Sequence, residues 1–77
     1  MLAPFSEAAT KLALGTYKHY KGNRYEVIGI GRHSETHQEM VIYRALYGAN
    51  EFWVRPLSSF LEMVEWEGHT VPRFKLI

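Results

Sequence analysis

Short runs of β-prone residues make up most of the chain after residue 15. They are rich in Val, Ile, Tyr, Phe and Trp, and turn-forming Gly, Asn or Pro residues separate several of them, as is typical of strands joined by turns. The runs cover residues 16–20, 25–32, 39–47, 51–55, 63–66 and 71–77. This pattern predicts a mainly β protein of five or six short strands.

Glycine and proline positions refine this prediction. Gly29 and Gly31 lie inside the run 25–32, where they indicate a β-bulge or a sharp bend of the kind that a small barrel needs to close. Pro56 ends the fourth run, and residues 57–60 predict a single helical turn, which we expect to be 3₁₀. The predicted architecture is therefore an SH3-like small barrel, and an open β-meander with a docked helix is the alternative.

The first fifteen residues differ from the rest in their pattern. Ser6 is a suitable N-cap for a short helix over 7–14, and Gly15 suits the C′ position that follows a helix. A helix of about two turns needs to dock on the rest of the protein to be stable. We therefore expect an N-terminal extension with a short helix over 1–15, followed by one small β domain over 16–77.

Composition limits the classes of function. The chain has 77 residues, so it forms one small domain in which only about 63% of the unfolded surface is buried, and a deep pocket is not expected. It has no cysteine, which excludes disulfides, thiolate zinc sites and a cysteine nucleophile. The net charge of +1 lacks the signature of a polyanion-binding domain. No apolar run is long enough to span a membrane and no signal peptide is visible, so we expect a cytoplasmic protein.

Several motifs after residue 15 carry a family resemblance. The matching segments are Tyr17–Asn23, Tyr25–Val27, Arg32–Thr36, Val41–Tyr47, Trp53–Pro56 and Phe60. In these segments the chain resembles a bacterial family of domains of unknown function, number 1653 in that series. The resemblance implies a short cytoplasmic β domain, and it implies no particular activity.

The loop that is expected over 33–38 contains the best candidates for catalysis. His33, Glu35 and His37 could coordinate Zn²⁺ if the loop stayed extended, but a solvated polar turn is the favoured interpretation, and we predict neither a metal nor a cofactor. A small enzyme would use His33 as a general base, with Glu35 or Glu26 orienting the imidazole. We predict no catalytic residue, because 77 residues enclose little volume from which water is excluded.

Aromatic and basic residues recur together on successive predicted strands. Flat rings offer stacking area, and arginine side chains bind phosphate or carboxylate groups. The predicted ligand-binding residues are Tyr20, Arg32, His33, Tyr43, Arg44, Trp53 and Arg55. In the alternative interpretation the aromatic residues fill the core, and Arg44 pairs with Glu26 or Glu35 across the sheet.

The resulting prediction for function is a binding module rather than an enzyme. A peptide or protein partner, or a small anionic ligand, fits the near-neutral charge better than long nucleic acid does. Short single-stranded nucleic acid or a nucleotide is an alternative, since it requires only a local patch. A structural accessory domain, in which Trp53 and Arg44 are buried and paired, is a third hypothesis.

Overall fold

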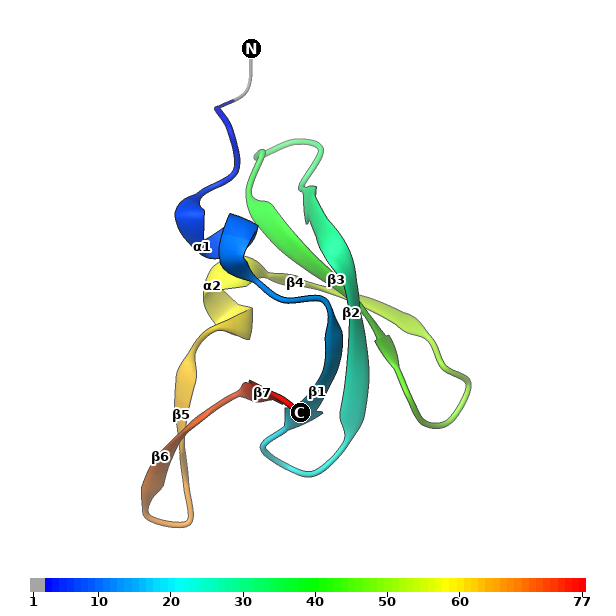
Figure 1. Cartoon of the computed structure of the whole chain (residues 1–77), viewed down its shortest axis with the longest axis vertical. Coiled ribbons are helices and arrows are strands. Elements are labelled where there is room, and N and C mark those ends of the chain that lie inside the picture. Colours follow the sequence, from blue (N-terminus) through cyan, green and yellow to red (C-terminus); the bar gives the residue numbers. More distant parts are fainter. Residues whose placement is uncertain (1–2) are drawn as a thin grey trace.

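Strands dominate the structure, which is a computed structural model that describes residues 3–77 (Figure 1). In chain order the elements of this part are α1 (Glu7–Lys11), β1 (Gly15–His19), β2 (Arg24–Arg32), β3 (Glu39–Ala45), β4 (Phe52–Pro56), α2 (Leu57–Phe60), β5 (Met63–Trp66), β6 (His69–Pro72) and β7 (Phe74–Leu76). The prediction of a mainly β protein with a short N-terminal helix is confirmed. The first two residues of the predicted N-terminal extension lie outside the described residues.

The strands form two antiparallel sheets. Five of them make a sheet with the order β4-β3-β2-β1-β7, and β5 and β6 pair as a separate hairpin. In the described residues β4 and β7 do not pair with each other, so the large sheet stays open and the term barrel applies only loosely. The helices cover the inner face instead, because Ala9 of α1 and Leu57 and Phe60 of α2 belong to the core cluster.

The predicted bulge in β2 is confirmed. The pairing of β2 with β3 shifts by one residue between Val27 and Gly29, so that Val27 lies opposite Tyr43 while Gly29 lies opposite Ile42. The additional residue, Ile28, bends the strand and increases its twist. This bend curves the sheet around the core without closing it.

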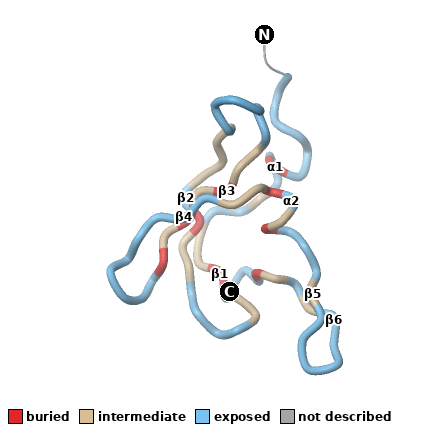
Figure 2. Tube along the Cα trace, turned by 180° about the vertical axis from the view of Figure 1, so that it is seen from behind, coloured by how far each residue is buried: buried red, intermediate tan, exposed pale blue. Residues whose placement is uncertain are grey.

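Aromatic rings form the centre of the core. Phe60 stacks on Phe74 with 4.3 Å between ring centroids, and Tyr17 and Tyr43 meet Phe60 edge-on at 5.4 and 5.8 Å. Figure 2 shows buried segments on both helices and along the large sheet, whereas no residue of the β5–β6 hairpin is buried. The hairpin is therefore held by few contacts to the main body.

Helix α1 is shorter than the sequence predicted. Ser6 does cap it, since its hydroxyl accepts the Ala9 amide at 3.1 Å, but the helix ends at Lys11 and Leu12 is already extended. Leu12 packs against the core there, and the Tyr17 hydroxyl donates to the carbonyl of Ala13 at 2.7 Å. The predicted role of residue 15 as the C′ glycine is therefore wrong, because that glycine begins β1.

The C-terminal half corrects two further predictions. Residues 57–60 form an α-helical turn rather than a 3₁₀ turn, since the Leu61 amide donates to the Leu57 carbonyl. The last predicted run is two strands in different sheets, which separate at Arg73. The backbone amide of Arg73 donates to Glu62, and its carbonyl accepts the Tyr20 amide, both at 3.0 Å. Glu62 precedes the β5–β6 pair Met63–Pro72, and Tyr20 follows the β1–β7 pair His19–Phe74. The chain therefore passes from one sheet to the other at Arg73.

Candidate binding pocket

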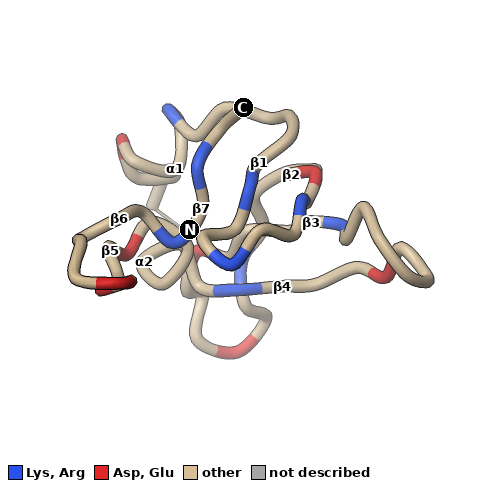
Figure 3. The backbone as a smooth tube through the Cα atoms, turned by 90° about the horizontal axis from the view of Figure 1, so that it is seen from below, with Lys and Arg blue, Asp and Glu red and all other residues tan. Residues whose placement is uncertain are grey.

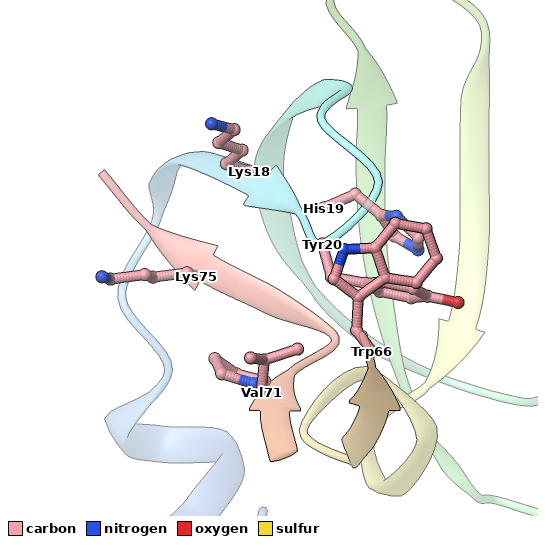
Figure 4. A pocket seen from close by; sticks show the side chains of 7 residues that line it. Lys18, His19, Tyr20, Trp66, Val71 and Lys75 are labelled. Atoms are coloured by element: carbon pink, nitrogen blue, oxygen red, sulfur yellow. The ribbon is translucent and has the colours of Figure 1, made fainter. Parts of the chain in front are cut away.

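A shallow pocket of about 240 Å³ lies where the end of the large sheet meets the β5–β6 hairpin (Figure 4). It is lined by residues of β1, the turn that follows β1, β5, β6 and β7. The lining residues are Lys18, His19, Tyr20, Trp66, Val71, Pro72 and Lys75. Rings thus stand on one side of the opening and lysines on the other, which brings apolar and cationic groups together at one place.

The aromatic wall of the pocket is built by a tight turn after β1. The Gly22 amide donates to the His19 carbonyl at 2.8 Å, and Gly22 adopts a φ of 113°, which favours glycine. This turn lays the Tyr20 ring on the His19 ring at 4.4 Å, and Trp66 meets Tyr20 nearly perpendicularly at 5.2 Å. Trp66 is still 40% exposed, so its ring is available to a ligand.

His19 is the titratable ring of this wall. Its Nδ1 accepts the Lys21 amide at 3.1 Å, so the neutral ring carries its proton on Nε2, and its ring meets Phe74 edge-on at 5.0 Å. Burial lowers the pKa of His19 below its ordinary value, and the charges of Arg55, Arg73 and Lys21 lower it further. The basic surroundings that disfavour an imidazolium ion favour an anion at the same place.

We expect His19 to make the fold less stable in mild acid. A histidine whose pKa is lowered by folding binds more protons in the unfolded chain, so the stability it contributes is present above about pH 6.5 and declines as the pH falls through its folded-state pKa. An NMR titration of the His19 ring should show a midpoint below 6.5. Denaturant unfolding at pH 7 and pH 5 should show a smaller loss for His19→Gln than for the parent chain.

The exposed histidine of β6 provides the control for this prediction. His69→Gln is the control variant, because it removes a histidine at the exposed end of the hairpin. A midpoint for His19 at or above 6.5, or the same effect from both variants, would contradict the prediction.

Basic residues form a row beside the pocket on the outer face of the large sheet. Lys18 of β1 lies opposite Arg24 of β2 on one side and opposite Lys75 of β7 on the other. All three side chains are exposed, and none of them is in an ion pair with any residue of 3–77. Figure 3 shows the basic positions of β1 and β7 side by side. Like charges on neighbouring strands destabilise a sheet, so the fold itself does not explain this row.

The structure does not bring the seven predicted ligand-binding residues together. Tyr20 lies in the pocket, whereas Arg32 and His33 lie at the far end of β2. The Arg32 guanidinium covers the Phe5 ring at 4.4 Å and donates to the Ala3 carbonyl, so it fixes the N-terminal segment.

The other predicted residues divide between the core and two surfaces. Tyr43 is buried in the core, as the alternative interpretation had it, and therefore offers no ring to a ligand. Arg55 is half-buried and bonds Tyr43 and Ser59, which ties β4 to β3 and α2. Arg44 pairs with Glu26 at 2.9 Å on the outer face, and Trp53 is 48% exposed on β4.

The histidine-rich loop after β2 stabilises its own turn. Nδ1 of His33 accepts the amides of Glu35 and Thr36 at 3.1 and 3.3 Å, and this whole loop is exposed. Within residues 3–77 no three His, Asp or Glu side chains are grouped so that they could hold a metal ion. The loop thus matches the solvated polar turn of the sequence analysis.

Sequence reasoning missed Lys18, Trp66 and Lys75 as site residues. These residues lie close together only because β1 pairs with β7 and because the β5–β6 hairpin packs against the turn after β1. Both are contacts between segments that are distant in the sequence. The available signals were local: Trp66 comes directly before a Glu-Gly turn, and Lys18 adjoins the aromatic pair at 19–20.

The fold and pocket define a small open-sheet β domain, and the comparisons with known proteins agree with this class. The family model described as "Protein of unknown function (DUF1653)" matches residues 15–76, so the chain belongs to this family. A crystal structure of a DUF1653 protein from Bordetella bronchiseptica superposes with a TM-score of 0.83 at 31% identity, over 90% of this chain and 91% of that one. No curated protein matches the chain. Neither helix of residues 3–77 is long and apolar enough to cross a bilayer.

Proposed function

We propose that this DUF1653 domain is a binding module whose pocket takes a small ligand with a flat apolar part and an anionic group. The observation that carries the proposal is the unpaired basic row Arg24–Lys18–Lys75, which runs in register across three strands and contributes Lys18 and Lys75 to the side of the pocket opposite the aromatic wall. Such a row costs stability, and an anion bound beside it would remove that cost.

Each part of the pocket has a complementary part in the ligand. Tyr20 and Trp66 present ring faces and edges on which a planar group can stack, and Val71 adds an apolar floor. Lys18 and Lys75 carry flexible ammonium groups, which bind phosphate or carboxylate as point charges. Figure 4 shows their ammonium groups directed outward, away from the rings, so the anionic group would lie toward solvent and the planar group toward the hairpin.

The size and charge of the site favour a small ligand. The pocket holds about 240 Å³, and the whole chain has a net charge of only +1. Three cations in a row can neutralise one or two anionic groups, whereas the backbone of a long nucleic acid requires a more extended basic surface. A cytoplasmic location is part of the proposal, since a chain without cysteine is suited to a reducing compartment.

The test compares three probes that separate the two parts of the ligand. Phenyl phosphate carries both a ring and an anion, phenol carries only the ring, and inorganic phosphate carries only the anion. In an amide and indole NMR titration we expect phenyl phosphate to shift His19, Tyr20, Trp66, Lys18 and Lys75, with affinity about tenfold higher than either other probe. Added salt should weaken the binding of phenyl phosphate and leave the binding of phenol unchanged.

Variants assign the contributions to particular side chains. Lys75→Gln should lower the affinity for phenyl phosphate severalfold, and Lys18→Gln together with Lys75→Gln should lower it about tenfold. The reason is that each exposed charge contributes on the order of 1 kcal/mol to the free energy of binding. Trp66→Leu should weaken the binding of phenyl phosphate and leave the affinity for inorganic phosphate unchanged. Lys11→Gln is the matched control, since Lys11 lies on α1 and pairs with Glu7. Equal affinities for the three probes, or equal losses in Lys11→Gln and Lys75→Gln, would exclude this site.

A further inference from the structure

The free edge of the large sheet at β4 is unusually apolar. Phe52, Trp53 and Val54 are 65%, 48% and 57% exposed, and no charged residue lies between Glu51 and Arg55. The opposite edge, β7, is only three residues long and carries Lys75 at its centre. Short strands and lysines protect sheet edges from pairing with other strands, so β7 is protected and β4 is open.

Backbone hydrogen bonds show which groups of β4 face outward. The Ala45 amide donates to the Glu51 carbonyl at 2.9 Å, and hydrogen-bonded positions alternate along an antiparallel pair. The backbone groups of Trp53 and Arg55 therefore point to β3. Those of Phe52 and Val54 point to the free edge, where no strand of the described chain pairs with them.

We infer that β4 is a self-association strand, which pairs antiparallel with β4 of a second copy of this chain. A two-fold axis at Trp53 places Phe52 of each copy opposite Val54 of the other, so the outward amides and carbonyls form four hydrogen bonds. The Phe52 and Val54 side chains then pack together on the outer face, and the two Trp53 rings meet on the inner face.

The neighbouring registers are excluded by the ends of the strand. An axis at Val54 would place Phe52 opposite Pro56, which has no amide hydrogen to donate. An axis at Phe52 would place Val54 opposite Asn50, which has a left-handed φ of 55° in the turn before β4. The β3–β4 turn also projects away from both helices, which leaves room for a second copy (Figure 1).

The area of the contact predicts a weak dimer. The exposed parts of two rings and a valine amount to roughly 300–400 Å² per chain when an aromatic side chain is counted at about 200 Å². Stable complexes bury about 800 Å² per partner, so this strand contact belongs to the weak, transient class. The dimer should therefore form only at high micromolar to millimolar concentration. In it, two five-stranded sheets become one continuous sheet.

Sedimentation over a concentration series tests the inference on the full chain. The mass should rise from 9.0 kDa toward twice that value and stop there, since a two-fold contact closes on itself. In the same range the amides of Phe52 and Val54 should become protected from hydrogen exchange, while that of Trp53 is already protected by β3. Val54→Pro should abolish the rise, because it removes an outward amide without removing a bond to β3.

Two further variants keep the test decisive if the proline variant does not fold. Val54→Lys places a charge on the edge and should keep the chain monomeric, whereas Leu14→Lys changes an equally exposed apolar residue away from the edge and should leave the dimer intact. A monomer at every concentration, a mass that grows beyond the dimer, or a dimer that survives both changes at Val54 would each overturn the inference.

Discussion

Replacing Phe60 by alanine is expected to lower the free energy of unfolding by about 3–5 kcal/mol, the largest loss of any single change discussed for this domain. Phe60 is only 1% exposed, it stacks on Phe74, and it meets Tyr17 and Tyr43 edge-on. Its removal leaves a cavity between α2 and three strands. Small domains have little stability to spare, so the variant should be largely unfolded. Denaturant unfolding followed by circular dichroism measures the loss.

Phe52 provides the matched control for this prediction, since the same substitution there removes a ring that is 65% exposed. At low concentration, where the chain is monomeric, Phe52→Ala should change the free energy of unfolding by no more than about 0.5 kcal/mol. Similar losses for the two variants would show that the ring at position 60 is not the centre of the core.

Replacing Gly15 by alanine is expected to cost about 1–3 kcal/mol, the second-largest effect. Gly15 begins β1 with a φ of 128°, a backbone conformation that residues with a Cβ rarely adopt. The pairing of Gly15 with Val27 in the β1–β2 ladder holds this conformation, so the backbone cannot easily relax, whereas an added Cβ would make only an ordinary van der Waals contact with Leu76 at 3.8 Å. Thermal unfolding of the variant should show a clearly lower midpoint.

Gly29 is the control for the backbone argument. It also lies in a strand, but its φ is not positive, and an added Cβ would meet nothing within 4 Å. Gly29→Ala should therefore be neutral, or should stabilise the fold by up to about 1 kcal/mol through reduced freedom of the unfolded chain. If Gly15→Ala is as well tolerated as Gly29→Ala, the strain assigned to Gly15 is absent.

The strands were predictable from the sequence because they are local patterns, whereas their partners were not. The apolar, β-prone residues at 39–47 and the paired glycines of β2 located a strand and a bulge correctly. The split of the last run at Arg73 depends on backbone bonds to Glu62 and Tyr20, which no local pattern reveals. The open sheet has the same origin, since closure depends on whether β4 and β7 meet.

The site shows the same limit. The idea of an aromatic and basic surface followed from residue types, and Tyr20 does lie in the pocket. Tyr43 and Arg55 were grouped with it because they share that chemistry, yet the strand pairing turns them toward the core and α2. Lys18 and Lys75 are ordinary surface lysines in the sequence, and only the β1–β7 register makes them neighbours.

Under the proposed function, the separation of the two sheets at Arg73 would couple ligand binding to the ordering of the β5–β6 hairpin. Part of the lining belongs to the large sheet and the turn after β1, while Trp66, Val71 and Pro72 belong to a hairpin that contains no buried residue. A molecule that packs on both Tyr20 and Trp66, whose rings already meet at 5.2 Å, would hold the hairpin more firmly to the main body. Linkage requires this effect to be reciprocal. If the ligand stabilises the docked hairpin by a certain free energy, docking of the hairpin stabilises the bound ligand by the same free energy. Under the proposed function, substitutions in β5 and β6 at residues that never touch the ligand would therefore change its affinity.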